Sequence, residues 1–136
     1  TTGGLDVVRH ADQLKNTVAR LREVGIQVSL FIDTDLKQIR KARAIGVEAV
    51  EINTGPYVDS NENEQQKLLA KVVSAARLAE RQHLEVLAGH GLTYTNVESI
   101  ASIKEIVEVN IGHSLVARAV LVGMKQAVQE MRRLLD

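Results

Sequence analysis

Two histidines stand beside glycines at points where a short apolar run ends. His90 lies between Gly89 and Gly91, and His113 follows Gly112 in a smaller version of the same arrangement. An imidazole can donate or accept a proton near neutral pH, and glycine lets backbone N–H groups approach a ligand without a Cβ atom in the way. The two turns can therefore form one site for acid–base chemistry if the strands that precede them are neighbours.

A glutamate inside an apolar segment is the next candidate. Glu51 lies between Val50 and Ile52, where an unpaired carboxylate would be costly to bury. If the segment is a strand whose residues 50 and 52 face covering helices, the side chain of Glu51 points to the opposite face. The alternative is a carboxylate that pairs with a basic side chain for purely structural reasons.

The segments that carry these residues alternate between strand and helix patterns. Short runs rich in β-branched residues predict strands that start near residues 26, 47, 84 and 108. Amphipathic spacing predicts helices at about residues 12–24, 35–45, 62–82, 97–103 and 114–135. We expect Thr34 or Asp35, Asn96 and Ser114 to serve as N-caps, and Gly25 to serve as a C-cap.

This alternation specifies an α/β fold with a parallel sheet and right-handed crossovers. All four turns after the predicted strands are polar or rich in glycine. That distribution favours a (β/α)8 TIM barrel, in which every strand can bring a functional loop to one rim, over an open sheet. A barrel needs about 200 to 250 residues. We therefore expect residues 1–136 to be a single domain that forms the C-terminal half of a TIM barrel.

Composition limits the partners. Lys plus Arg equals Asp plus Glu at 17 each, and aromatic residues make up only 2% of the chain, so we expect no nucleic-acid partner. There is no cysteine, and we find neither a signal-peptide pattern nor an apolar run of about 20 residues. These observations predict a cytoplasmic protein without a membrane partner.

Metal binding has only weak support in the sequence. Asp33 and Asp35 could ligate Mg²⁺, but a position at a strand end and a helix cap account for them equally well. No Walker-type or dinucleotide-binding fingerprint is present. We therefore expect neither a metal nor another cofactor.

Four collinear motifs resemble the second half of the pyridoxine 5′-phosphate synthase family, and the resemblance extends from residues 3–7 to the final helix. They are residues 28–33 (VSLFID), 51–55 (EINTG), 88–94 (AGHGLTY) and 108–113 (EVNIGH). The resemblance implies a (β/α)8 barrel that assembles as a homo-octamer. It also implies a cofactor-free condensation of 3-amino-2-oxopropyl phosphate with 1-deoxy-D-xylulose 5-phosphate, which releases phosphate and water.

The resemblance further implies roles for individual residues. His90 matches the family's proton donor, and Glu51 matches a glutamate that stabilises the transition state. Three further positions match residues that contact 3-amino-2-oxopropyl phosphate in the family: Gly91, Gly112 and His113. Independently, N–H groups exposed at the helix start after Gly112 suit a phosphate. Thr1 matches a contact to 1-deoxy-D-xylulose 5-phosphate, although one residue of the family pattern Thr-Thr-any-Gly-Gly is missing here. Asn53 also departs from the family, because histidine is commoner at that position.

The resemblance places other essential groups in the first half of the barrel. The family's two further proton acceptors, a histidine and a glutamate, and several phosphate-binding arginines belong there, so we expect the isolated chain to be inactive. A half-barrel would also expose sheet edges and apolar surface, which favours self-association. Two alternatives stay open: a non-catalytic half-barrel scaffold or phosphate-binding module, and another barrel enzyme that acts on phosphosugars.

Overall fold

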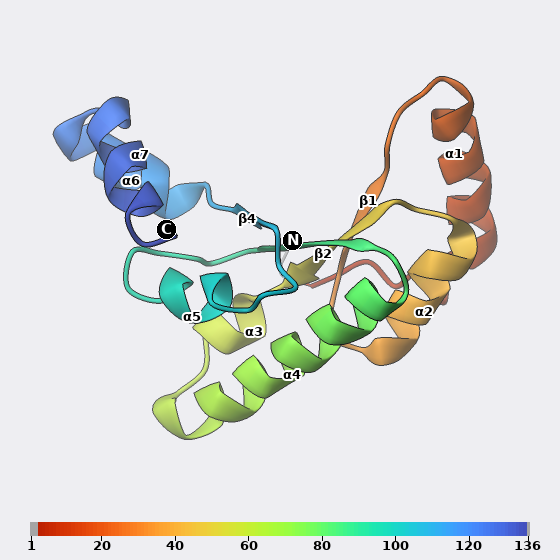
Figure 1. The fold of residues 1–136 in the computed structure, drawn as a ribbon, viewed down its shortest axis with the longest axis horizontal. Coiled ribbons are helices and arrows are strands. Elements are labelled where there is room, and N and C mark those ends of the chain that lie inside the picture. The colour runs from red at the N-terminus through yellow and green to blue at the C-terminus, as the bar shows by residue number, and fades with distance from the viewer. Residues whose placement is uncertain (1–2, 136) are drawn as a thin grey trace.

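A four-stranded parallel sheet forms the centre of the computed structural model, which describes residues 3–135 (Figure 1). The strands lie in sequence order, so that strands consecutive in the chain are paired and the first and last strands form the edges of the sheet. They are β1 (Ser29–Ile32), β2 (Ala49–Asn53), β3 (Glu85–Gly89) and β4 (Glu108–Asn110). The helices are α1 (Ala11–Glu23), α2 (Leu36–Ile45), α3 (Gly55–Val58), α4 (Glu62–Arg81), α5 (Val97–Ala101), α6 (His113–Val122) and α7 (Met124–Arg132).

The predicted α/β class and the four parallel strand–helix units are confirmed, and the sheet is consistent with part of a (β/α)8 barrel. The predicted N-cap of α2 is also confirmed, as Asp35 and not Thr34. Asp35 Oδ1 accepts the Lys37 N–H at 2.9 Å, and Gly46 ends the helix in the left-handed conformation. None of the helices in residues 3–135 is both long and apolar enough to cross a membrane.

Two predicted segments are wrong in detail. The final helix is divided into α6 and α7, because Gly123 between them has φ 84° and ψ 151°, a conformation that side chains other than glycine avoid. Residues 55–58, for which no helix was predicted, form the short helix α3, which carries Pro56 in its first turn.

Two of the predicted N-cap side chains do not cap their helices. Asn96 occupies the predicted N-cap position of α5, but its side chain does not bond to the helix; its Oδ1 accepts the N–H of Thr93 at 2.8 Å. Ser114 lies inside α6, whose N-cap is Gly112, and the Ser114 hydroxyl donates to the carbonyl oxygen of Leu92 at 2.7 Å. In both cases the side chain forms a hydrogen bond with the backbone of the loop after β3. The sequence did not indicate these bonds.

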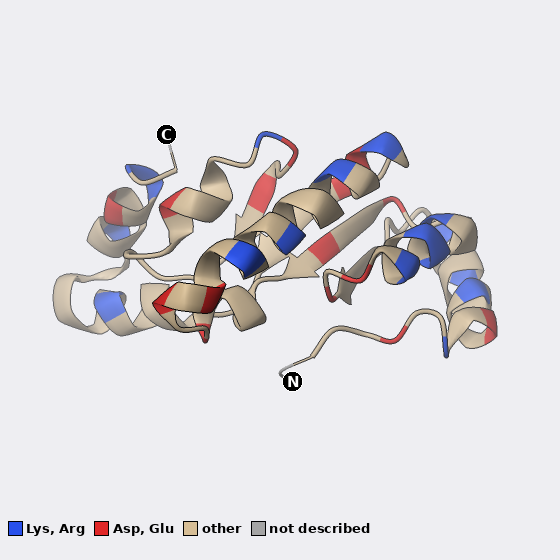
Figure 2. Cartoon of the chain, turned by 90° about the horizontal axis from the view of Figure 1, so that it is seen from below, with Lys and Arg blue, Asp and Glu red and all other residues tan. Residues whose placement is uncertain are grey.

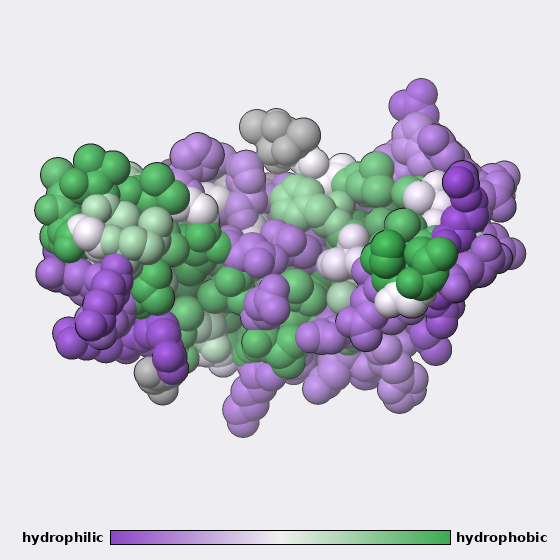
Figure 3. Space-filling view, turned by 90° about the horizontal axis from the view of Figure 1, so that it is seen from above, coloured by the Kyte–Doolittle hydropathy of each residue, from purple (hydrophilic) through white to green (hydrophobic). Residues whose placement is uncertain are grey.

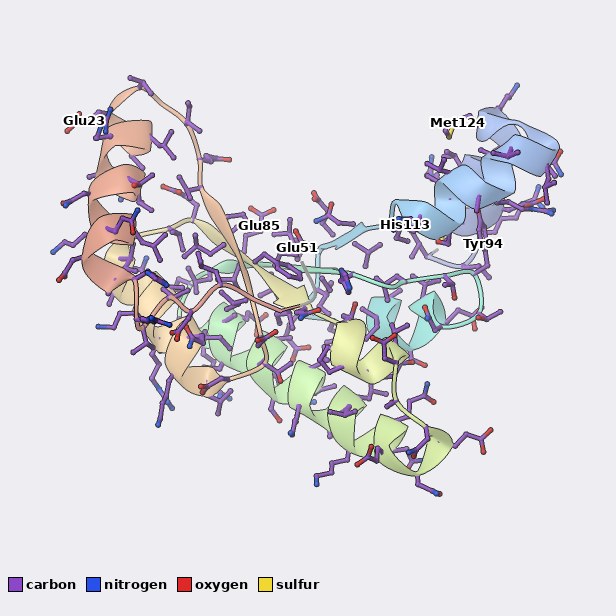
Figure 4. All side chains as sticks on the ribbon, turned by 180° about the vertical axis from the view of Figure 1, so that it is seen from behind. Glu23, Glu51, Glu85, Tyr94, His113 and Met124 are labelled. Carbon is purple, nitrogen blue, oxygen red and sulfur yellow. The ribbon has the colours of Figure 1, made fainter. Side chains whose placement is uncertain are left out.

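The two faces of the sheet differ in chemistry. Alternate strand residues are buried against α2 and α4 on one face, where the core includes Leu30, Ile32, Val50, Ile52, Val86 and Ala88. The opposite face carries a row in register that runs Phe31, Glu51, Leu87 and Glu108. Figure 4 shows Glu51 and Glu85 on this face, which α4 does not cover.

Charge is segregated although the net charge is zero. None of the four strands contains Lys or Arg, whereas three of them contain glutamate; the basic residues lie largely on helices (Figure 2). The uncovered face of the sheet therefore carries the strand glutamates beside Phe31 and Leu87, with no basic side chain from the strands. In a barrel this face would line the interior. The glutamates on it distinguish this interior from one filled with aliphatic side chains.

Candidate active site

The loops that follow β3 and β4 surround a cavity at the C-terminal end of the sheet. It has a volume of about 640 Å³ and is lined by His90, Gly91, Leu92, Thr93, Asn110, Ile111, Gly112, His113 and Ser114. Four predicted site residues, two from each loop, therefore share one cavity. The fifth, Glu51, is not part of the lining, and Thr1 lies outside the described residues.

His90 is held in an unusual backbone conformation. Its φ is +83°, and Gly91 follows with φ +74°; the left-handed region is unfavourable for a residue that has a Cβ atom. The imidazole lies over Gly55, since a Cβ atom at position 55 would come within 2.7 Å of His90 Cδ2. On another side the ring faces Phe31, with 6.3 Å between the ring centroids. These contacts leave His90 exposed to solvent at the cavity while they restrict its ring.

Glu51 lies beside the cavity and is linked to it by Asn110. Partial burial raises the pKa of the Glu51 carboxyl above its usual value, and the negative charge of Glu108 acts in the same direction. A hydrogen bond from Asn110 and the nearby His90 lower this pKa in part. The carboxylate packs against Gly89, where a Cβ atom would coincide with Glu51 Oε1. His90 is therefore close enough to Glu51 to lower the pKa of the Glu51 carboxyl electrostatically.

The α6 end of the cavity suits an anion. Gly112 is the N-cap of α6 and His113 is its first residue, and no side chain of residues 3–135 caps the helix. The N–H groups of its first turn are thus available, and the helix dipole favours a negative charge there. Figure 4 shows His113 at this end of the helix. The α6 end of the cavity therefore presents N–H groups that suit an anion, and it shares the cavity with His90.

Hydrogen bonds join the two loops to each other. The Ser114 hydroxyl donates to Leu92 O at 2.7 Å, and the Tyr94 hydroxyl donates to Ala127 O at 2.9 Å. Both bonds connect the α6–α7 hairpin with the loop that carries His90; Ser114 donates from the hairpin, and Tyr94 donates from the loop. The distance between His90 and the α6 end of the cavity is therefore fixed by side chains as well as by the β3–β4 pairing.

The two residues that follow Ile52 support the site and were not predicted as site residues. Asn53 and Thr54 are the buried polar side chains of the described chain. Asn53 Nδ2 donates to Asp33 Oδ1 at 2.8 Å, and its Oδ1 accepts the Gly55 N–H at 2.9 Å. The only feature of the sequence that could have identified Asn53 and Thr54 as site residues is their position at the end of a strand. Gly89 and His90 occupy the equivalent position in the next strand–helix unit.

The two aspartates considered as metal ligands have structural partners. Asp33 accepts from Gly4 N and from Asn53, while Asp35 caps α2. Within residues 3–135, no group of three or more His, Asp or Glu side chains is arranged to hold a metal ion.

Comparison with known proteins gives consistent matches. The model of the family described as pyridoxal phosphate biosynthesis protein PdxJ matches residues 1–136. Proteins named pyridoxine 5′-phosphate synthase are similar to this chain: those from Magnetococcus marinus, Sulfurihydrogenibium sp. and Desulforapulum autotrophicum are 51%, 47% and 45% identical over 99% of it. The chain spans 56%, 56% and 57% of their respective lengths, which is little more than half.

Proposed function

Because the chain belongs to the pyridoxal phosphate biosynthesis protein PdxJ family, we propose that it is the C-terminal half of a pyridoxine 5′-phosphate synthase. The complete enzyme condenses 3-amino-2-oxopropyl phosphate with 1-deoxy-D-xylulose 5-phosphate and releases phosphate and water as the ring closes. The observation that carries this proposal is the single cavity that His90 shares with Gly112 and His113. It combines a proton donor with an anion site.

His90 is the proton donor in this proposal. Dehydration and loss of phosphate both need a proton delivered to a leaving oxygen, which an imidazole can supply near neutral pH. Its ring is exposed at the cavity and restricted by Gly55 and Phe31. Glu51 stabilises positive charge that develops on the substrate, and a carboxylate fixed between Gly89 and Asn110 needs little reorganisation to do so.

The start of α6 binds the phosphate of 3-amino-2-oxopropyl phosphate. Backbone N–H groups at Gly112 and His113 supply the donors, and Gly91 lets the opposite loop approach the same substrate. The contact of Thr1 with 1-deoxy-D-xylulose 5-phosphate, the homo-octamer and the cytoplasmic location stay predictions that rest on resemblance and composition.

A hybrid protein tests the proposal. The N-terminal part of the Magnetococcus marinus relative is joined to this chain, and the formation of pyridoxine 5′-phosphate and the release of phosphate are measured for the hybrid and for the chain alone. We expect an active hybrid and an inactive chain, because the remaining acids, bases and arginines of the family lie outside these residues. A folded hybrid without activity would contradict the proposal, and a chain that forms a stable, inactive, phosphate-binding dimer would favour the scaffold.

A further inference from the structure

Thr54 is the most deeply buried polar residue in the described part of the chain. The exposed fraction of the residue is 0%, although it lies in a turn at the rim of the sheet, immediately after β2. A buried hydroxyl is costly unless it is hydrogen-bonded. Its partners therefore indicate what the residue does.

The partners of Thr54 belong to the backbone of the neighbouring turn. Its N–H donates to Gly89 O at 2.8 Å, and its Oγ1 lies 2.7 Å from both Gly89 O and His90 O. A hydroxyl has one proton to donate. Since Gly89 O already accepts the Thr54 N–H, we assign the proton of the Thr54 hydroxyl to the hydrogen bond with His90 O. Thr54 thus contacts the peptide units on both sides of the His90 Cα atom.

Those peptide units determine where the His90 ring lies. The φ of +83° at His90 is unfavourable for a residue with a Cβ atom, so it persists only where the surrounding structure imposes it. We propose that Thr54 is the positioning residue that holds His90 in this conformation and keeps its ring over Gly55. The proposal rests on the function proposed above, because it gives His90 its purpose.

The turn after β2 acts on His90 from two directions. Thr54 fixes the backbone of His90, and the next residue, Gly55, provides the surface on which the ring rests. Without the Thr54 hydroxyl, the His90 peptide can relax toward negative φ, which swings the ring off Gly55 and away from the cavity. Because the phosphate site is on α6, substrate binding is preserved while proton transfer is lost.

Isosteric and conservative variants of the hybrid protein test the proposal. Thr54→Val removes the hydroxyl at nearly constant volume, whereas Thr54→Ser keeps it. Thr17→Val is the matched control, because the Thr17 hydroxyl also donates to a backbone carbonyl, that of Gln13 at 3.1 Å, but on exposed α1. The readouts are kcat and KM for 3-amino-2-oxopropyl phosphate, and the NMR signals of His90 in protein labelled with ¹⁵N-histidine, identified through His90→Gln.

We expect Thr54→Val to lower kcat by about 10- to 100-fold with KM changed less than about threefold. The NMR signals of His90 should shift and broaden while those of His10 and His83 stay in place. Thr54→Ser should recover kcat to within about threefold of the wild type, and Thr17→Val should have no effect.

Two results would overturn the proposal. One is a folded Thr54→Val variant with wild-type His90 signals; the other is a Thr54→Ser variant as impaired as Thr54→Val. The NMR readout needs no turnover, so an inactive wild-type hybrid would count against the proposed function alone. If Thr54→Val does not fold, a Thr54→Ser variant whose His90 signals match the wild type supports the positioning role.

Discussion

The two walls of the cavity are built in opposite ways. The His90 wall rests on the turn after β2, where Asn53 and Thr54 are 1% and 0% exposed and fully engaged in hydrogen bonds. The other wall rests on β4, a strand of three residues at the edge of the sheet, and on α6, where no residue is buried. The His90 wall is therefore pre-formed within this chain, whereas the α6 wall has little packing of its own.

The α6 wall also exposes apolar surface. Val120 and Leu121 are 81% and 78% exposed, and Val116 and Met124 lie nearby on the same hairpin. Figure 3 shows these elements as a large apolar area on the uncovered side of the molecule. Removing exposed apolar surface of this kind from water lowers the free energy of the protein. This chain therefore holds His90 through buried contacts of its own, whereas the start of α6 has few such contacts within residues 3–135.

The largest expected effect tests whether the His90 wall does chemistry. In the hybrid protein, His90→Ala should lower kcat by about 10²- to 10⁴-fold, the range typical for loss of a general acid. KM for 3-amino-2-oxopropyl phosphate should change little, since we propose that this substrate binds at the α6 wall. Steady-state kinetics measures both. Unchanged turnover would remove the proposed role of His90.

A pair of glycine variants compares the walls directly. Gly55→Ala would place a Cβ atom 2.7 Å from His90 Cδ2, so we expect a loss of about 1 to 3 kcal/mol in the free energy of unfolding and a fall in kcat of about 10-fold or more. Gly112→Ala meets no atom within 4 Å at a negative φ, and should cost less than about 1 kcal/mol. Denaturant unfolding gives both free energies. Equal costs would refute the difference between the walls.

Ser114→Ala breaks one of the two bonds that join the walls. Loss of a hydrogen bond of about 1 kcal/mol corresponds to a rise of about fivefold in KM for 3-amino-2-oxopropyl phosphate, with kcat within about twofold. The control is Ser102→Ala, which removes an exposed hydroxyl bond to Ser99 O in α5. An effect on kcat larger than that on KM would mean that the link serves His90 and not the phosphate.

The smallest effect concerns the pH dependence of stability. The pKa of Glu51 is raised above its ordinary value of 4.5, so above that pH the folded state binds more protons than the unfolded state. The free energy of unfolding therefore falls as pH rises from about 4.5 through the raised pKa. The Glu51→Gln variant has no carboxyl group to titrate at this position, so its free energy of unfolding should decline less steeply as pH rises above about 4.5. Urea unfolding at several pH values measures it, and parallel curves for variant and wild type would contradict it.

The sequence predicted elements better than it predicted their connections. Periodicity placed the four strands and the helix of residues 62–81, since each depends on local alternation of apolar residues. It failed at Gly123, because a glycine within an apolar pattern does not reveal its own φ and ψ. It also failed for Ser114 and Asn96, whose local capping role was displaced by partners in the loop after β3.

The order of the strands, the glycine–histidine turns and the polar face of the sheet were determined by the sequence alone, because side-chain alternation and chain direction fix which residues share a face and an end. Only the tertiary structure decided how His90 is held. The pairing of β2 with β3 brings residues 35 positions apart into contact. On this pairing depend the left-handed backbone of His90, its contact with the Thr54 hydroxyl and the packing of its ring on Gly55. Contacts between such distant residues leave no periodic pattern in the chain that makes them.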